Sequence, residues 1–498
     1  MTTPDQFHQL QVALDHQRAG RILDAIKVCK RLAHEAPDGF EGIYLLAMLH
    51  AEQGDLAAAI EMFRRATAVR PEFLDAQYNL AVALSMAARH EEAAKSYEKI
   101  LKGNPRHLDA RNNYAASLLA SGRALDAVQQ YDQLIALNPA SADAYNNRGM
   151  ALQHLRRFGE ALSDYDKAIG LRPNFPQACV NRGNALISLR RPEDALASYQ
   201  RAVALKPDFA DAYNNIGNIY CDRGNYEEAL EAYDRALVLH VDDSEARSMR
   251  LYAKMHLCDW SDFKSECSSV ISSIKRGAPV YPFTILAFSS SLDEQLRCAR
   301  LFSKRYPLSA RPLWRGETYS HGRIRVAYVS TDFRQHAVSS ILAGMFEHHD
   351  KSKFEVTAIS IGPDDGSEMR RRLQHAFEYF VDARELADNE IAARIRQAEI
   401  DILIDLNGYT AGARLGIFAH RAAPLQVGYL GGTRGADYID YLIADATIVT
   451  PAQRPYYTEK IIYLPDSFQS VDDKRPISDK LYSRTELGLP EKGFVFCR

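Results

Sequence analysis

The chain of 498 residues is long enough for about three domains, and its content of hydrophobic (46%) and charged (25%) residues is ordinary for a globular protein. A formal net charge of −3 and the absence of any long Lys or Arg block argue against nucleic acid and anionic membranes as main partners. The amino terminus has no signal-peptide pattern and no apolar run approaches the roughly 18 residues of a membrane span, so we expect a cytoplasmic protein.

The first half of the chain repeats every 34 residues, which is the length of the tetratricopeptide repeat. One proline marks each repeat, at Pro37, Pro71, Pro105, Pro139, Pro173 and Pro207. An alanine and, four residues later, an aromatic residue also recur, from Ala59 and Phe63 to Ala229 and Tyr233. These two positions lie one helical turn apart and predict helix packing. We therefore expect an α-solenoid of about seven repeats over residues 6–243, with a concave binding surface.

Five consecutive repeats carry asparagine at the same position, at Asn79, Asn113, Asn147, Asn181 and Asn215. Stacked repeats would align these amides in a ladder. Each amide is both a donor and an acceptor, so the ladder could pair with the backbone of an extended peptide whatever its side chains. We predict a groove that binds protein or peptide acceptors. The alternative is that asparagine is simply common at this position of the repeat.

The period ends after Val241, and the following segments predict two further regions. Residues 244–321 have helical patterns and are expected to form a helical bridge. Residues 322–498 alternate apolar runs with helix-patterned segments, which predicts an α/β, Rossmann-like lobe with a parallel sheet. No GxGxxG follows its first strand and no GxxxxGK[ST] occurs, so neither a dinucleotide fingerprint nor a P-loop is present.

Polar residues directly follow two of the predicted strands, residues 323–330 and 400–406. Ligands of open α/β sheets bind beyond the carboxyl ends of the strands, so we predict a site there. His336, after the first strand, is the only candidate base at a strand end, and histidine is suited to proton transfer near neutral pH. Two alternatives remain: a histidine that holds its own loop by hydrogen bonding, or one that orients the substrate without taking its proton.

Three groupings could suggest a metal site, and we reject each of them. Asp164 and Asp166 flank a tyrosine in the second helix of a repeat, which we interpret as coincidence. His348, His349 and Asp350 are adjacent at a predicted helix end, where neighbouring side chains face different directions. The seven cysteines include no CxxC pair, which argues against a zinc cluster and a disulfide framework.

Repeats followed by RVAYVSTDFRQHAVS, GPDDG, DILIDLNGYTAGAR, APLQVGYLGG and DYLIAD resemble the O-linked N-acetylglucosaminyltransferases of glycosyltransferase family 41, in their bacterial form. The resemblance covers nearly the whole chain. It implies a GT-B fold of two Rossmann-like lobes, and transfer of N-acetylglucosamine from UDP-GlcNAc to Ser or Thr hydroxyls of proteins, with inversion and without a metal or other cofactor. It also implies that His336 is the active-site histidine, and that Asn407 and Thr410 approach the sugar and diphosphate.

The predicted substrate-binding residues are Asn407, Gly408, Tyr409, Thr410 and Gly431. Glycine lets a backbone approach a ligand closely, although a tight turn alone would explain Gly408 and Gly431 equally well. Family members usually carry a GYPGT loop after the strand that ends at Tyr429. This chain has a loop two residues shorter, residues 431–435, so we expect that wall of the site to be displaced.

The chain ends at Arg498, where its sequence resembles the entry to a second lobe. A doubly wound lobe takes on the order of 150 residues, so we expect the second lobe, with most of the nucleotide site, to be missing. The last apolar strand, residues 493–497, would then have an unpaired edge.

We therefore predict an α-solenoid followed by the first half of a GT-B catalytic region. The predicted function is that of a protein O-GlcNAc transferase whose repeats recruit acceptors, with catalysis by this polypeptide alone in doubt. One alternative is a non-catalytic, peptide-binding repeat scaffold, which UDP binding would distinguish from an enzyme. Another is a relative that transfers a different nucleotide sugar.

Overall fold

The computed structural model describes residues 4–189, 191–309, 311–410, 412–474, 480, 482–490 and 492. The chain divides into two compact units. The first comprises Met1–Trp260 and Glu385–Ala387, and the second comprises Ser261–Arg384 and Asp388–Arg498. The main division at Trp260 falls inside the stretch predicted as a helical bridge. The predicted last strand, residues 493–497, and Arg498 lie outside the described residues.

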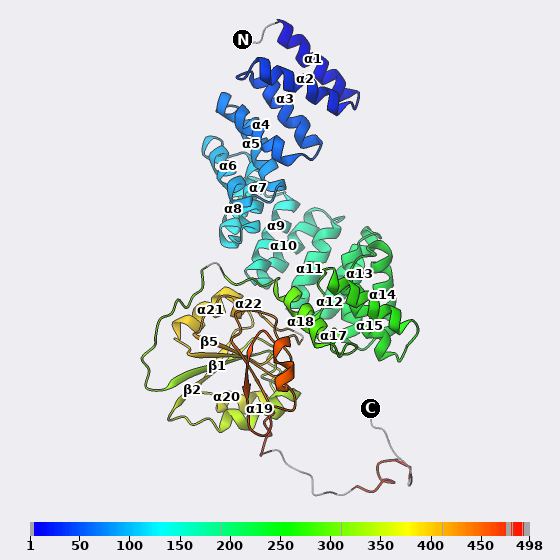
Figure 1. The fold of residues 1–498 in the computed structure, drawn as a ribbon, viewed down its shortest axis with the longest axis vertical. Coiled ribbons are helices and arrows are strands. Elements are labelled where there is room, and N and C mark those ends of the chain that lie inside the picture. Colours follow the sequence, from blue (N-terminus) through cyan, green and yellow to red (C-terminus); the bar gives the residue numbers. More distant parts are fainter. Residues whose placement is uncertain are drawn as a thin grey trace. The chain divides into compact units, whose positions relative to one another are not determined.

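The first unit consists of short helices joined by turns, each helix packing against the next (Figure 1). Helices α1 to α14 form seven consecutive pairs, which confirms the predicted solenoid. The helices are α1 (Pro4–Arg18), α2 (Ile22–Glu35), α3 (Phe40–Glu52), α4 (Leu56–Val69), α5 (Leu74–Met86), α6 (His90–Gly103), α7 (Leu108–Ala120), α8 (Ala124–Leu137), α9 (Ala142–His154), α10 (Phe158–Leu171), α11 (Pro176–Ser188), α12 (Pro192–Leu205), α13 (Ala210–Asp222), α14 (Tyr226–Leu239) and α15 (Ser244–His256).

The repeat prolines explain where the second helix of each pair ends. Helix α4 ends at Val69, two residues before Pro71, and α2 ends at Glu35, two residues before Pro37. Proline has no N–H for a helical hydrogen bond and its ring clashes with the preceding turn, so the helix stops ahead of it.

No helix among the described residues is long and apolar enough to cross a membrane.

The recurring alanine and aromatic positions are buried, as predicted. The alanines are 0% exposed and the aromatic residues at most 1% exposed. They are Ala59 with Phe63, Ala93 with Tyr97, Ala127 with Tyr131, Ala161 with Tyr165, Ala195 with Tyr199, and Ala229 with Tyr233. Glycines let the first helix of a repeat approach the ring: a Cβ added at Gly149 would lie 2.7 Å from Cε1 of Tyr165, and one at Gly217 would lie 2.6 Å from Cε1 of Tyr233.

The second unit is built on a parallel sheet of seven strands in the order β3-β2-β1-β4-β5-β6-β7. This confirms the predicted α/β lobe. The strands are β1 (Ile324–Ser330), β2 (Phe354–Ser360), β3 (Tyr379–Asp382), β4 (Ile402–Asp405), β5 (Leu425–Tyr429), β6 (Tyr441–Ala444) and β7 (Lys460–Tyr463). The helices are α16 (Phe263–Lys275), α17 (Pro282–Ile285), α18 (Leu292–Ser303), α19 (Ala337–Glu347), α20 (Glu368–Ala376), α21 (Asp388–Gln397), α22 (Gly416–Ala419) and the 3-10 helix η1 (Pro451–Tyr456).

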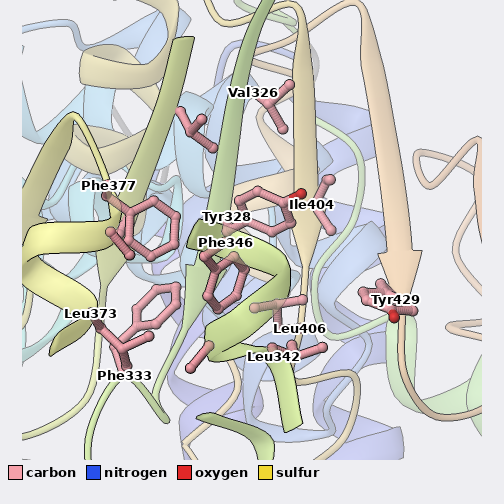
Figure 2. Close-up of a cluster of buried hydrophobic side chains, with 14 of the residues drawn as sticks. Val326, Tyr328, Phe333, Leu342, Phe346, Leu373, Phe377, Ile404, Leu406 and Tyr429 are labelled. Carbon is pink, nitrogen blue, oxygen red and sulfur yellow. The ribbon is translucent and has the colours of Figure 1, made fainter. Parts of the chain in front are cut away.

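Helices cover both faces of the sheet, with α19 and α20 on one side and α21 and α22 on the other (Figure 1). Under α19 and α20 lies a core rich in aromatic side chains (Figure 2). The Phe346 ring lies 4.7 Å from that of Phe377 and 5.0 Å from that of Tyr328 on β1. Phe333, from the loop after β1, enters the same core with its ring 5.4 Å from Phe377. Because Phe333 is only 1% exposed, it anchors the loop that carries the predicted active-site histidine.

We predict that Gly217→Ala destabilises the first unit by about 1–3 kcal/mol, because the added methyl group forces the buried Tyr233 ring to move. Thermal unfolding followed by circular dichroism measures this loss. Gly170→Ala is the matched control, since nothing lies within 4 Å of a Cβ added to that α10 residue. The control should be neutral or slightly stabilising, because alanine favours a helix more than glycine does. Equal stability of the two variants would contradict the close packing.

Candidate active site

The two predicted strand ends lie side by side where the strand order of the second unit reverses. Strands β1 and β4 are neighbours, with β2 beyond β1 and β5 beyond β4. The connections that leave β1 and β4 therefore turn away from each other, and this reversal point is where open α/β sheets bind ligands. The residues after Ser330 and after Asp405 meet at this edge of the sheet.

Asn407 joins the two strand ends. Its Oδ1 accepts a hydrogen bond from the backbone N of Thr331 at 2.9 Å. Its Nδ2 lies 2.6 Å from Oγ1 of Thr331, 3.0 Å from Oδ2 of Asp332 and 3.2 Å from Oγ1 of Thr410. The Asn407 residue is 5% exposed, and its amide is fully occupied by protein groups. In this structure Asn407 positions the loop after β1, while its predicted approach to the sugar stays a prediction.

A buried ion pair lies beneath Asn407. The Arg434 Nε donates to Oδ2 of Asp405 at 2.8 Å, and their side chains are 1% and 7% exposed. The Asp405 carboxylate also accepts from the backbone N of Asn407 at 2.9 Å and of Gly408 at 3.1 Å. Gly408 has a φ of +59°, and a Cβ there would lie 3.1 Å from Cζ of Arg434. Glycine at 408 is thus required both by the backbone angle and by the close approach of the arginine.

Three further residues of this edge, Asp405, Asp332 and Arg434, were not predicted from the sequence. We refer to these three residues together with Asn407 and Thr331 as the strand-end network. A charged residue that ends an otherwise apolar strand was the available signal for Asp405. Arg434 lies in the loop that follows β5, and only the fold shows that it reaches β4.

The loop after β5 is held in turn by Glu459. This 4% exposed carboxylate accepts from the Arg434 backbone N at 2.6 Å and from Oγ1 of Thr433 at 2.7 Å. Gly431 is exposed and has a φ of +83°. A Cβ added at Gly431 would lie 3.7 Å from Nη1 of Arg434. The backbone at Gly431 is therefore accessible to a ligand, whereas Thr433 and Arg434 are buried. The predicted displacement of this wall stays a prediction.

Tyr409 and Thr410 occupy different surroundings. The Tyr409 hydroxyl donates to the backbone carbonyls of Arg434 and Ala299, and its ring lies 5.4 Å from that of Phe302 on α18. Burial raises the pKa of Tyr409. Tyr409 is therefore packed against α18 and the loop after β5. Thr410 is exposed, and its hydroxyl donates to the Asn407 carbonyl at 3.1 Å.

His336 caps the amino terminus of α19. Its Nδ1 accepts from the backbone N of Val338 at 3.3 Å and lies 3.7 Å from Oδ2 of Asp332. A neutral imidazole that accepts at Nδ1 carries its proton at Nε2, so Nε2 is a donor in this arrangement. The side chain is 36% exposed. Asp332 thus lies between His336 and Asn407. The His336 side chain is accessible, whereas Asn407 is buried.

The asparagines of the first unit form hydrogen bonds with one another. A continuous series runs from Asn181 to Asn146 (3.0 Å), Asn147 (3.1 Å), Asn112 (3.2 Å), Asn113 (3.3 Å) and the Tyr78 hydroxyl (3.0 Å), each amide Nδ2 donating to the next group. At the ends, Asn79 donates to the Tyr44 hydroxyl at 2.7 Å and Asn215 donates to Asn184 at 3.2 Å. A primary amide has two N–H groups, and in Asn79 and Asn146 the same Nδ2 also contacts a methionine sulfur, that of Met48 at 3.3 Å and that of Met150 at 3.8 Å. The predicted peptide-binding role stays a prediction, and the ladder also links the repeats.

Asp164 and Asp166, the two aspartates rejected above as metal ligands, form ion pairs with arginine side chains. Arg148 contacts Asp164 and Asp132, each at 2.6 Å, and Arg182 contacts Asp166 at 2.6 Å. In the described part of the chain, no three His, Cys, Asp or Glu side chains gather into a group that could hold a metal ion.

We predict that Arg434→Met destabilises the second unit by about 3–5 kcal/mol, because it leaves the buried Asp405 carboxylate unpaired. The double variant Asp405→Asn/Arg434→Met should recover part of this loss, since it removes both charges. Chemical denaturation of the whole chain measures both effects. Lys353→Met, which breaks an exposed pair with Asp350, should cost less than about 1 kcal/mol. A loss no greater than this control would contradict the role of the buried pair.

Comparisons with known protein families agree with this architecture. Residues 309–493 match the family described as glycosyl transferase family 41. Tetratricopeptide repeat families match residues 12–67, 44–107, 78–131, 142–175 and 180–244. A mutant of the Thermobaculum terrenum O-GlcNAc transferase aligns with a TM-score of 0.35 and 22% identity, over 73% of this chain and 58% of that chain.

Two curated relatives carry names that state an activity. One relative is the Arabidopsis thaliana protein named probable UDP-N-acetylglucosamine--peptide N-acetylglucosaminyltransferase SEC. The chain is 35% identical to it over 274 residues, and this alignment covers 49% of this chain and 28% of that protein. The chain is 34% identical over 231 residues to the Caenorhabditis elegans UDP-N-acetylglucosamine--peptide N-acetylglucosaminyltransferase, covering 43% of this chain and 20% of that protein. The chain spans less than a third of the length of either relative. Residues 309–493 of this chain thus form a glycosyl transferase family 41 region, and tetratricopeptide repeats precede it.

Proposed function

We propose that this protein takes part in the transfer of N-acetylglucosamine from UDP-GlcNAc to Ser or Thr hydroxyls of proteins that its repeats recruit in the cytoplasm. The family 41 match and the names of the two relatives support this reaction. The observation that carries the proposal is the meeting of His336 and Asn407 through Asp332 at the reversal point of the sheet. This edge is where a doubly wound lobe binds a nucleotide or its sugar.

Inverting transfer requires an acceptor hydroxyl held behind the anomeric carbon and a favourable environment for the departing diphosphate. The family resemblance implies that no metal neutralises that charge. Backbone amides and helix amino termini would then take over this role. Helix α19 begins at Ala337, directly after His336, so its amino terminus lies at the same edge of the sheet. The accessible backbone at Gly431 is a further candidate for contact with the donor.

The strand-end network supports the reaction by holding its groups in place. Effective catalysis depends on groups fixed close to the reacting geometry before the substrate arrives. Asn407 hydrogen-bonds the backbone at Thr331 and the side chain of Asp332, which faces His336. The Phe333 anchor holds the middle of the same loop. Asn407 thus acts as a positioning residue, and His336 is the side chain available to a substrate.

The geometry favours an orienting role for His336. With Nδ1 accepting from Val338, the neutral ring offers Nε2–H to a substrate oxygen. To act as a base at Nε2, the ring would have to move its proton to Nδ1 and exchange the Val338 bond for one to Asp332, now 3.7 Å away. We therefore propose that His336 orients the substrate by hydrogen bonding.

In an assay of transfer from UDP-GlcNAc to a protein acceptor, His336→Ala should lower the turnover rate by roughly 100-fold, because misplacement of a substrate by about 1 Å can cost a rate of this order. His336→Gln retains an N–H donor and should keep clearly more activity than the alanine variant. His375→Ala, which changes an exposed histidine on α20 outside the site, is the control and should leave turnover unchanged.

The three variants separate the possible roles of this histidine. Equal loss in His336→Ala and His336→Gln would favour proton abstraction over orientation. Near-normal turnover of His336→Ala would remove this residue from the mechanism and leave it as a helix cap. Circular dichroism of each variant shows whether the fold is retained, so that a loss of turnover can be assigned to the site.

A further inference from the structure

A groove between the second helices of the first two repeats is open, whereas its equivalent farther along the array is partly filled. The open groove, which we name the first groove, lies between α2 and α4 over α3 and has a volume of about 630 Å³. Its equivalent four repeats later, between α10 and α12 over α11, has a volume of about 290 Å³. Most lining positions of the two grooves correspond. The difference therefore arises from the side chains that line them.

An arginine from the first helix of the repeat fills the later groove. Arg182 of α11 donates to Asp166 of α10 and to Ser198 of α12, both at 2.6 Å. Arg148, one repeat earlier, contacts an aspartate on α8 and another on α10 in the same way. In these repeats the groove thus holds a charged side chain that bonds to both walls.

The first groove has neither this arginine nor its acidic partners. Leu46 stands at the position of Arg182, and Met62 stands at that of Ser198. Lys30 stands at the position of Asp166, so the charge of that wall is reversed. His34 lies one helical turn after Lys30 on the same face of α2 and also lines the groove. Within the described residues, neither Lys30 nor His34 forms an ion pair.

The floor of the first groove contains a buried ring nitrogen that forms no hydrogen bond with any described residue and has a carboxylate only at ion-pair distance. His50 is 7% exposed, and its Nδ1 has no hydrogen-bond partner among the described residues. Its closest carboxylate, Asp55, lies 3.5 Å from Nδ1, outside hydrogen-bond geometry. The next four repeats have leucine at this position, namely Leu84, Leu118, Leu152 and Leu186. Burying a ring nitrogen without a hydrogen bond costs free energy that leucine would avoid, and a ligand that offers a hydrogen-bond partner would remove that cost.

Two carboxylates also line the first groove, but neither of them belongs to α2, the helix that carries Lys30 and His34. The Asp55 carboxylate caps α4 by accepting from the backbone N of Ala58 at 3.1 Å. Glu61 is exposed on α4, across the groove from Lys30 and His34 on α2. Arg65 on α4 is a second cationic side chain of the lining, besides Lys30. An acceptor that enters along α2 therefore meets Lys30, His34 and the ring of His50.

We propose that the first groove binds the side chain of an Asp or Glu residue from an extended segment of a partner protein. A carboxylate supplies the acceptor that Lys30, His34 and His50 lack. The apolar lining of Ala33 and Leu46 would cover the stem of that side chain and the adjoining backbone. A free anion would leave this lining uncovered, and the volume far exceeds that of a single carboxylate. This interaction does not depend on the transfer step, because its residues all belong to the first two repeats.

The test is calorimetric titration of the full chain, in about 50 mM salt, with the amidated peptide Gly-Gly-Glu-Leu-Glu-Gly-Gly and with its counterpart that carries Gln in place of both Glu residues. We expect the Glu peptide to bind about 10-fold more tightly, as a charge-assisted hydrogen bond in a partly buried site allows. The asparagine ladder would meet only the peptide backbone and therefore would not distinguish the two peptides.

Variants that copy the side chains of the later repeats locate the binding. Lys30→Asp/Leu46→Arg recreates the aspartate and arginine of the filled groove, and it should abolish the preference for the Glu peptide while circular dichroism stays unchanged. Lys30→Gln serves if the double variant does not fold, and it should reduce the preference about fivefold. Arg182→Leu is the matched control, because it opens the later groove. The wall of that groove carries Asp166, whose negative charge repels a carboxylate, so this variant should not gain a site for the Glu peptide.

Four results would overturn the proposal. These are equal binding of the two peptides, no binding of either peptide by a folded chain, and a preference that persists in both Lys30 variants. The fourth is displacement of the Glu peptide by inorganic phosphate at the same concentration, which would assign the groove to a free anion.

Discussion

The candidate site depends on one buried carboxylate. Asp405 ends β4 inside the protein, and its charge is balanced by Arg434 and by the backbone N–H groups of Asn407 and Gly408. A buried carboxylate without such partners would be costly, so the turn after β4 and the loop after β5 are fixed together. Asn407 then extends this order to the loop after β1, where His336 is presented to solvent. The geometry proposed for the reaction thus depends on a buried ion pair.

The parts of the fold that follow from local pattern could be predicted from the sequence. The 34-residue period and its small and aromatic positions correspond to buried contacts such as Ala229 with Tyr233. The strand ends at Ser330 and Asp405 could also be located, because apolar runs stop there. The order of the strands could not be predicted, since periodicity does not specify which strands are neighbours. Without that order, the meeting of β1 and β4 at the reversal point was out of reach.

The candidate site was predicted less completely than the fold, for the same reason. Residue type and position identified His336 and Asn407, but Arg434 reaches β4 from a loop that the sequence places after β5. Tyr409 shows the opposite case: its position after a strand suggested a ligand contact, whereas its hydroxyl bonds to backbone carbonyls beside α18. The first groove could be predicted only in part. Leu46 stands where two of the later repeats carry Arg148 and Arg182, which is visible in the sequence, but the meaning of this difference required the contacts of Arg182.

The measurement that tests the account most directly is calorimetric titration of UDP into the 498-residue chain, with circular dichroism to confirm that the protein is folded. Transfer from a UDP-sugar requires a site for the nucleotide, whereas a peptide-binding scaffold does not. The account predicts saturable binding of UDP, because the reversal point of the sheet, where open α/β sheets bind ligands, lies within the described residues. Absence of binding by a well-folded chain would contradict it, and would leave the repeats as the functional part of this polypeptide.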